Sequence, residues 1–318
     1  MSFVPFVVSC DFKSIFACNI SRAMYSNKQG MPTENFDIAE RDGAENLEQP
    51  APDVEQQEPI GVHNTDSVQR HHNFISKFVP YQRDLVIYLP PDYEESNRRY
   101  PVLYLHDGQN LFDPDTAYVR GMDWKVDETA EALIRSGEIE PLIIVGIYNT
   151  GIHRIEEYTP TRDRKLGGGH AELYGRMLVE ELKPFIDARY RTLGDAHNTG
   201  LGGSSLGGLA TLYLGFTHPE IFGKLAVLSP SVWWDNKAIL KIIQKTQPKP
   251  RLKIWLSMGT EESKTGVRDA NLLDQVLIAK GWREDDDLHY EVIPGAKHEE
   301  AAWAERVEPV LRFLFPNT

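Results

Sequence analysis

Short apolar runs alternate with amphipathic stretches along most of this chain, from about residue 72 onwards. The apolar runs are typical of buried strands, which we expect at 83–90, 100–105, 142–147, 199–204, 225–229, 251–258 and 288–293. Helical periodicity predicts helices at 124–136, 172–188, 206–216, 238–245, 269–280 and 299–313. Because strands and helices alternate, the pattern indicates a three-layer α/β fold, with a mostly parallel central sheet and helices on both faces.

The first part of the chain lacks this alternation and has a different composition. Between residues 31 and 70, ten acidic side chains face only Arg41 and Arg70, and Gln, Pro and Asn fill much of the remainder. Such a segment cannot bury enough apolar surface to offset the conformational entropy that is lost on ordering. We therefore predict a disordered acidic leader over residues 1–71 and a single domain over residues 72–318.

An apolar stretch at residues 3–8 precedes Ser9-Cys10, and this junction resembles a lipoprotein cleavage box. However, no Lys or Arg precedes the stretch, and it is too short for the apolar core of a signal peptide. The alternative interpretation is a disordered tail or a true start at Met24 or Met31. We expect a cytoplasmic protein rather than an exported one.

Charge and cysteine content exclude several classes of protein. The formal net charge of −13 disfavours nucleic-acid binding and docking on anionic lipid, because both need a basic surface. No apolar run is long enough to span a bilayer. Cys10 and Cys18 provide no disulfide framework for the main domain, and their spacing does not fit a zinc site. We expect neither a metal nor another cofactor.

A glycine-rich pentapeptide, Gly203-Ser204-Ser205-Leu206-Gly207, joins a predicted strand to a predicted helix. It matches Gly-x-Ser-x-Gly, in which the serine occupies a strained turn and the glycines avoid clashes around it. This turn lifts the serine hydroxyl clear of the sheet and places the next backbone amide near a nascent oxyanion. The glycine spacing selects Ser205 rather than Ser204 as the nucleophile. A turn needed only for close packing is the alternative.

A serine nucleophile needs a general base, usually histidine, and in α/β-hydrolases the acid and the histidine follow the serine in the chain. Two histidines lie far beyond Ser205. His289 falls inside a predicted strand, whereas His298 follows the turn-rich residues 294–297 and precedes the last helix. We therefore predict that His298 is the base, although a surface histidine that caps a helix has the same pattern.

The carboxylate that orients this base must follow a strand between the serine and the histidine. Glu261 and Glu262 come just after the strand expected at 251–258, and Asp269 lies further on. Each of the three carboxylates can serve as the acid, so the pattern leaves the choice open.

The second oxyanion donor should lie in the loop after an early strand, and His106-Asp107-Gly108-Gln109-Asn110 follows the strand at 100–105. We assign the oxyanion hole to the backbone amides of Leu206 and Gln109, with Gly108 as the alternative to Gln109. His106 is expected to be a hydrogen-bonded structural residue. A simple tight turn is the competing interpretation of this loop.

Two adjacent tryptophans, Trp233 and Trp234, follow the strand expected at 225–229. Beyond a strand end, they can line the substrate pocket and stack on a sugar or an aromatic acyl group. They can equally belong to the core beneath a cap.

Five motifs occur in an order that is similar to that of one known family. They are His106–Asp113, Glu157–Pro160, Gly202–Gly208, Ser229–Asp235 and Gly295–His298. With them the chain resembles, over about residues 72–316, the putative esterase family of the α/β-hydrolase superfamily. That family includes enterochelin-esterase-like proteins, feruloyl and acetyl xylan esterases, S-formylglutathione hydrolases and mycolyltransferases.

The resemblance implies an α/β-hydrolase fold and carboxylic ester hydrolysis. It maps Ser205 and His298 onto the nucleophile and the base of the family. The acid of the family commonly lies three residues after a glycine that ends a strand, which here is Glu262 after Gly259. Many relatives carry Asp at this position.

We therefore expect a cofactor-independent serine esterase that forms an acyl-enzyme from a small acyl, feruloyl or acetyl sugar, or siderophore-type ester. An acyltransferase that uses the same acyl-enzyme and a non-catalytic binding module of the same fold are the alternatives. The sequence specifies neither the ester nor the oligomeric state.

Overall fold

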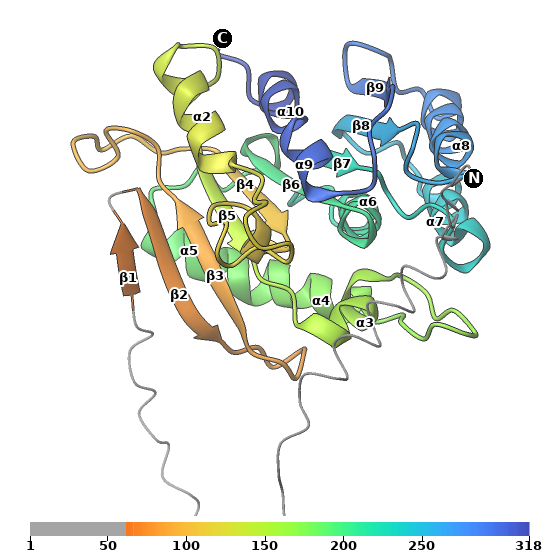
Figure 1. Ribbon diagram of the computed structural model, residues 1–318, viewed down its shortest axis with the longest axis horizontal. Helices are drawn as coiled ribbons and strands as arrows, with labels where there is room; N and C mark the ends of the chain where they lie inside the picture. The colour runs from red at the N-terminus through yellow and green to blue at the C-terminus, as the bar shows by residue number, and fades with distance from the viewer. Residues whose placement is uncertain (1–61, 66, 318) are drawn as a thin grey trace, which may run out of the picture. The chain divides into compact units, whose positions relative to one another are not determined.

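The computed structural model describes residues 62–65 and 67–317, so residues 1–61 of the expected leader lie outside the described residues. The described part of the chain forms one sheet of nine strands, seen in Figure 1. The strands are β1 (Val62–Thr65), β2 (Val68–Phe74), β3 (Arg83–Tyr88), β4 (Val102–His106), β5 (Ile143–Ile147), β6 (Thr199–Ser204), β7 (Lys224–Leu228), β8 (Lys253–Gly259) and β9 (Leu288–Ile293).

The strand order of the sheet is β1-β2-β3-β5-β4-β6-β7-β8-β9. The strands from β5 to β9 in this order run parallel, whereas β1, β2 and β3 are antiparallel to their neighbours. The register pairs Leu105 of β4 with Gly202 of β6, and Ser204 of β6 with Leu228 of β7. The loops after these strands therefore begin side by side at the carboxyl edge, where such sheets bind ligands.

Helices cover both faces of this sheet (Figure 1). The α-helices are α2 (Val126–Arg135), α3 (Arg154–Tyr158), α4 (Ala171–Arg176), α5 (Lys183–Arg189), α6 (Leu206–Thr217), α7 (Trp234–Lys245), α8 (Gly266–Ala279), α9 (Glu300–Ala304) and α10 (Val307–Leu314). The 3₁₀ helices are η1 (Gly108–Asn110), η2 (Gly151–His153) and η4 (Ala196–Asn198), and η3 (Met177–Leu182) is a π-helical segment.

The two faces bury alternate residues of the strands, as the period of two requires. On one face, α2 and α10 share an apolar core with Leu103 and Ala226. On the other face, α6 packs on Leu225, and a Cβ added to Gly215 would lie 2.5 Å from the Leu225 side chain. The close approach of α6 to β7 therefore needs a glycine at position 215, and it brings the start of α6 to the carboxyl edge of β6.

Every strand expected from the sequence is present, and β6 and β9 agree with the predicted ranges. Two predicted helices are divided. The one at 172–188 becomes α4, η3 and α5, and the one at 299–313 becomes α9 and α10. Pro184 is the second residue of α5 and directly follows the π-helical segment η3, whereas Pro309 lies in the first turn of α10, where a missing amide breaks no helical hydrogen bond.

The sheet begins upstream of residue 72, the position at which the composition placed the start of the domain. Strands β1 and β2 both precede or cross that boundary. In β2, only Val68 and Phe74 are apolar, and the residues between them are polar or titratable. This strand is held mainly by its pairing with β3, so its sequence lacks the apolar run that marks a central strand.

Candidate active site

Ser205 occupies the turn between β6 and α6 and is 7% exposed. Its backbone is strained, with φ 58° and ψ −118°. Hydrogen bonds hold this conformation: the Ser205 amide donates to the Leu228 carbonyl at 3.0 Å, and its carbonyl accepts from the Ser231 amide at 3.0 Å. A Cβ at Gly203 would lie 3.1 Å from the His106 side chain, so a larger residue beside the turn would require His106 to shift.

The structure brings Ser205, His298 and Glu262 into one hydrogen-bonded chain. His298 lies in the loop between β9 and α9, and its Nε2 is 2.9 Å from Ser205 Oγ. Its Nδ1 is 2.9 Å from Glu262 Oε2, in the turn after β8. The Trp303 ring packs edge-on against the imidazole at 4.9 Å between centroids. This order of hydroxyl, imidazole and carboxylate is the arrangement of a serine hydrolase triad.

The Glu262 carboxylate is buried but well supplied with donors. Its Oε1 accepts from the Gly259 amide at 2.6 Å, from Ser229 Oγ at 2.6 Å and from Arg306 Nη2 at 3.1 Å. Burial opposes the charge on Glu262, but the hydrogen bonds from His298, Ser229 and Gly259 outweigh it and hold the pKa of this carboxyl below its usual value. Glu262 is therefore ionised and fixed in place beside the imidazole.

The other two acid candidates lie elsewhere. Glu261 is exposed, and its backbone amide donates to the Ala296 carbonyl at 3.0 Å. Asp269 is buried on α8, where Lys237 Nζ lies 3.4 Å from its Oδ1 and Thr265 donates to its Oδ2 at 3.2 Å. Of the three carboxylates weighed from the sequence, Glu262 is the one that contacts His298.

The proposed oxyanion donors, Leu206 and Gln109, lie in the first turns of α6 and η1. Amides at such positions have no carbonyl partner within their own helix and can receive a ligand. Gly108, the alternative donor, begins η1 and packs tightly against β5, because an added Cβ would lie 2.5 Å from the Gly146 carbonyl carbon. Strands β4 and β6 are neighbours, so η1 and the Ser205 turn lie at the same edge of the sheet.

Asp107 anchors the loop that carries η1. It is 4% exposed, and both its oxygens accept from Arg154 at 2.7 Å, while Asn149 Nδ2 donates to Oδ1 at 2.7 Å. Burial raises the pKa of Asp107, but Arg154 and Asn149 more than offset this and hold it below its usual value. Arg154 Nη2 also lies 3.5 Å from the Ser204 carbonyl, so one half-buried guanidinium links both loops.

His106 has the structural role expected of it. It is fully buried, and its Nδ1 lies 2.9 Å from the Tyr174 hydroxyl. Burial lowers the pKa of His106 to about 3, so the ring is neutral.

The expectation that both tryptophans line the pocket does not hold for Trp234. This residue is 1% exposed, and its Nε1 donates to the Thr161 carbonyl at 2.8 Å. A Cβ at Gly168 would lie 2.9 Å from its ring, so Trp234 packs under the 161–168 loop as part of the core. Trp233 is half-buried and is the one of the pair with surface to offer a substrate.

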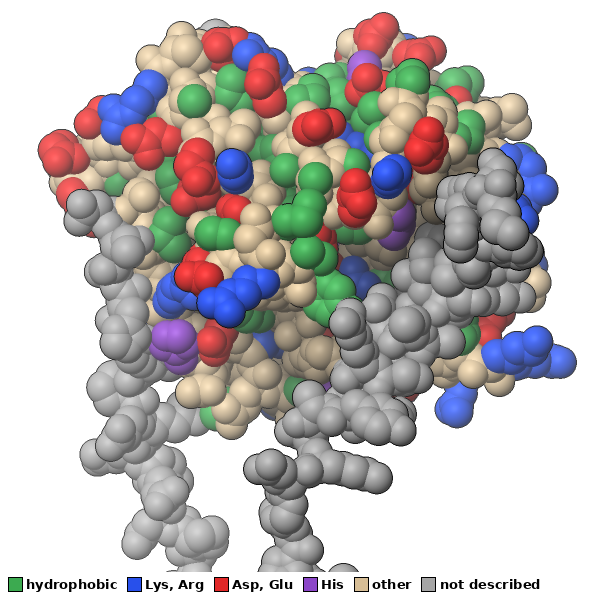
Figure 2. Space-filling view, in the orientation of Figure 1, with side chains coloured by type: hydrophobic (Ala, Val, Ile, Leu, Met, Phe, Trp, Pro, Cys, Tyr) green, Lys and Arg blue, Asp and Glu red, His purple; other side chains and the backbone are tan. Residues whose placement is uncertain are grey.

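The loop between η1 and α2 carries exposed apolar side chains. Tyr118 is 66% exposed, and Val119 and Met122 are also exposed. The Tyr118 amide donates to Asn110 Oδ1 at 2.8 Å, which ties this loop to η1. Figure 2 shows hydrophobic side chains gathered in the middle of the face that Figure 1 presents.

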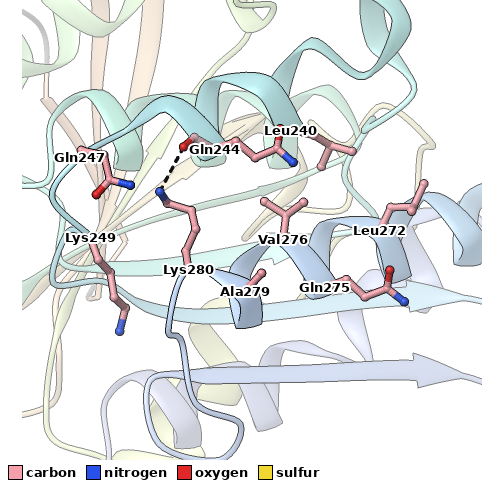
Figure 3. A pocket seen from close by; sticks show the side chains of 9 residues that line it. All are labelled: Leu240, Gln244, Gln247, Lys249, Leu272, Gln275, Val276, Ala279 and Lys280. Carbon is pink, nitrogen blue, oxygen red and sulfur yellow. Dashed lines mark hydrogen bonds between the residues drawn. The ribbon is translucent and has the colours of Figure 1, made fainter.

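A separate cavity of about 490 Å³ lies between α7 and α8 and contains no member of the triad (Figure 3). Its lining includes apolar side chains such as Leu240 and Val276 together with the polar side chain of Lys280. The Lys280 ammonium donates to the Gln244 carbonyl at 3.3 Å and to the Thr246 carbonyl at 2.8 Å, so its charge is engaged by the backbone.

Within residues 62–65 and 67–317, no group of three or more His, Cys, Asp or Glu side chains is arranged to hold a metal ion. The described helices include none that combines the length and the apolar character needed to cross a membrane.

Two arginines of the site, half-buried Arg154 and buried Arg306, could not be predicted from the sequence. Arg154 lies in the short helix α3, which was not predicted, and Arg306 lies just before α10. Their partners, Asp107 and Glu262, are distant in the chain. No local spacing marks such a pair, because only the fold brings its members together.

The chain is similar to known proteins in sequence and in fold. The family described as "Putative esterase" matches residues 76–314. The endo-1,4-beta-xylanase/feruloyl esterase of Xylanibacter ruminicola is 29% identical over 237 residues, which are 72% of this chain and 29% of that protein. The ferri-bacillibactin esterase BesA of Bacillus subtilis is 32% identical over 160 residues, which are 45% of this chain and 51% of that protein.

A solved structure extends the likeness to the fold. The crystal structure of BES protein from Bacillus cereus has a TM-score of 0.63 at 24% identity, over 82% of this chain and 98% of that one. The fold is that of the α/β-hydrolases. With a family match that spans most of the domain, the chain belongs to the putative esterase family, which places it among the ester hydrolases.

Proposed function

We propose that this protein hydrolyses carboxylic esters by a serine mechanism that passes through an acyl-enzyme. The observation that carries the proposal is the chain of two 2.9 Å contacts from Ser205 through His298 to Glu262, set on a strained turn. An unstrained surface serine would not hold its hydroxyl against an imidazole in this way, and strained backbone is retained where function needs it.

In the acylation half, Ser205 Oγ attacks the ester carbonyl carbon while His298 Nε2 takes the hydroxyl proton. The carbonyl oxygen becomes an oxyanion that accepts hydrogen bonds from the amides of Leu206 and Gln109. The tetrahedral intermediate collapses, the C–O bond to the alcohol breaks, and the imidazolium returns its proton to the leaving alkoxide.

In the deacylation half, water attacks the acyl carbon and His298 takes a proton from it. The second tetrahedral intermediate expels Ser205 Oγ, which recovers the proton from the imidazolium, and the carboxylic acid leaves. Glu262 holds the tautomer with Nδ1–H toward itself and stabilises the imidazolium. Its lowered pKa keeps it ionised through both halves.

The substrate that we propose is a small acyl, feruloyl or acetyl sugar, or siderophore-type ester. Two observations support an ester with an apolar or aromatic part. Relatives are named for feruloyl and ferri-bacillibactin esters. In this chain, half-buried Trp233 and the exposed Tyr118, Val119 and Met122 offer apolar surface in loops at the carboxyl edge of the sheet.

The test is hydrolysis of p-nitrophenyl acetate and butyrate by the full chain. The Ser205→Ala variant should lose turnover by roughly 10³-fold or more, because the nucleophile is absent. Ser204→Ala, an identical change at the neighbouring serine, serves as the matched control and should retain hydrolysis. Undiminished turnover by a folded Ser205→Ala variant contradicts the mechanism. If turnover is lost in a folded Ser204→Ala variant alone, Ser204 is the nucleophile instead.

A further inference from the structure

Glu300, the first residue of α9, lies two residues after His298 and is 7% exposed. Its carboxylate accepts two hydrogen bonds from a distant part of the chain. Oε2 accepts from Trp124 Nε1 at 2.8 Å, and Oε1 accepts from Asn110 Nδ2 at 3.2 Å. These donors lie 176 and 190 residues away in sequence, in the segment that begins with the oxyanion loop.

Asn110 is the last residue of η1 and uses each of its polar groups. Its amide donates to the Asp107 carbonyl at 2.9 Å, and its own carbonyl accepts from the Trp124 amide at 2.8 Å. Its side-chain Oδ1 accepts from the Tyr118 amide at 2.8 Å, which leaves Nδ2 for Glu300. Asn110 is thus held by two side-chain and two backbone hydrogen bonds, and it transmits the position of Glu300 to the backbone of η1.

We propose that Glu300 is a positioning residue that couples the loop carrying His298 to the loop carrying the Gln109 amide. This inference rests on the function proposed above, since it gives Glu300 a part in the same reaction. The general base and the second oxyanion donor come from opposite ends of the chain, and their relative placement must be accurate to a fraction of an ångström. The Glu300 carboxylate joins the two loops through one residue.

The charge of Glu300 costs stability, which separates this role from simple packing. Burial, and then the Asp107 carboxylate, raise the pKa of Glu300 to about 7, although the Trp124 hydrogen bond and the Arg154 charge act against them. The folded protein therefore favours the protonated form, and stability present at low pH is lost as the pH rises through 7.

The first test is the Glu300→Gln variant of the full chain at pH 8, with the exposed neighbour Glu299→Gln as the matched control. Glutamine offers one acceptor oxygen for Trp124, but its NH₂ then faces the Asn110 NH₂. We expect the per-site rate constant for labelling by a fluorophosphonate probe, and kcat for p-nitrophenyl butyrate, to fall roughly tenfold with KM unchanged. The melting temperature should not fall, and Glu299→Gln should match the wild type.

The outcomes separate this inference from the proposed function. If the probe labels neither the wild type nor Ser205→Ala, both the serine mechanism and the role of Glu300 are overturned. If the probe labels the wild type and Glu300→Gln at rates within twofold of each other, only the role of Glu300 is overturned. A rate loss that is matched by a fall in melting temperature also overturns it, because the residue is then structural.

The second test exchanges donor and acceptor across the contact. Asn110→Asp combined with Glu300→Gln keeps the net charge and lets the glutamine NH₂ donate to the new carboxylate. We expect the double variant to label within about threefold of the wild type, whereas Asn110→Asp alone sets two carboxylates face to face and labels more slowly than Glu300→Gln. Losses that simply add in the double variant overturn the coupling.

Discussion

Glu262 and Glu300 are buried to a similar degree, 8% and 7% exposed, yet their pKa values shift in opposite directions. Glu262 contacts the Arg306 guanidinium and accepts from His298, Ser229 and Gly259. Within the part of the chain that the structure describes, the donors to Glu300 are the neutral side chains of Asn110 and Trp124, and the Asp107 carboxylate adds repulsion.

The difference teaches that burial alone does not decide the ionisation of a carboxylate. Hydrogen bonds from His298, Ser229 and Gly259 keep Glu262 charged despite its burial, which suits its proposed role of stabilising an imidazolium. Among the described residues, no cation contacts Glu300, and burial and the Asp107 carboxylate raise its pKa to about 7. Replacing the carboxylate by an amide should therefore change activity and stability differently at Glu262 and at Glu300.

The largest effect is expected at Glu262. Glu262→Gln removes the charge that stabilises the imidazolium and leaves the Arg306 guanidinium, 3% exposed, without its carboxylate. We expect kcat for p-nitrophenyl butyrate to fall by about 10³- to 10⁴-fold and the protein to lose about 3 kcal/mol of unfolding free energy at pH 7. Steady-state kinetics and urea unfolding measure both. A kcat within tenfold of the wild type removes Glu262 from the triad.

The two carboxylates, Glu262 and Glu300, should also affect the pH dependence of stability in opposite ways. The pKa of Glu262 is lowered, so this residue adds to the unfolding free energy at pH values above its usual pKa of 4.5. The added stability is lost as the pH falls through the folded-state pKa. The pKa of Glu300 is raised from 4.5 to about 7, so its contribution to the unfolding free energy is complete below pH 4.5. That contribution is lost as the pH rises through 7.

The unfolding free energy of Glu300→Gln relative to the wild type should therefore rise by up to about 3 kcal/mol from pH 4 to pH 9, on top of a pH-independent cost from the two NH₂ groups that face each other in the variant. Urea unfolding at a series of pH values measures this difference, with Glu299→Gln as the exposed control. A stability gain that is the same at pH 4 and pH 9 contradicts the assignment of the titration to Glu300.

The smallest effect is expected at a carboxylate next to the triad that does not contact His298. Glu261 precedes Glu262 in the chain but is exposed. We expect Glu261→Gln to change kcat by less than about twofold, because an exposed charge is screened by solvent. The assay with p-nitrophenyl butyrate decides between the two neighbours, and a large loss in Glu261→Gln would exchange their roles.

The central strands and the Ser205 turn could be predicted from the sequence for a physical reason. Buried parallel strands are continuous apolar runs, and the strained turn of Ser205 requires glycines at set positions. In contrast, β2 is mostly polar and is held by pairing with β3, so its pattern carries little signal. The domain was therefore expected to begin later than it does.

Parts of the site that depend on tertiary contacts could not be predicted in the same way. Glu261 and Glu262 differ only in the direction of their side chains after β8, which the local pattern does not determine. The resemblance to a family, rather than the spacing, singled out Glu262. Arg306 and Glu300 lie near the last two helices, where periodicity identifies an apolar face but not the partner of a buried charge.

Trp234 illustrates the same limit for apolar residues. A tryptophan beyond a strand end fits a pocket wall and a core position equally well, and only the fold shows the loop that covers it. Trp233, its neighbour, retains exposed surface.

The central claim is that Ser205 is the nucleophile, and peptide mass spectrometry after fluorophosphonate labelling tests it most directly. The folded full chain, treated at pH 8 and digested, should carry one phosphonyl group on the peptide that contains Ser205, with fragment ions that place it on this residue. The Ser205→Ala variant should carry none. A phosphonyl group on another residue of the wild type, or labelling that persists in Ser205→Ala, contradicts the account.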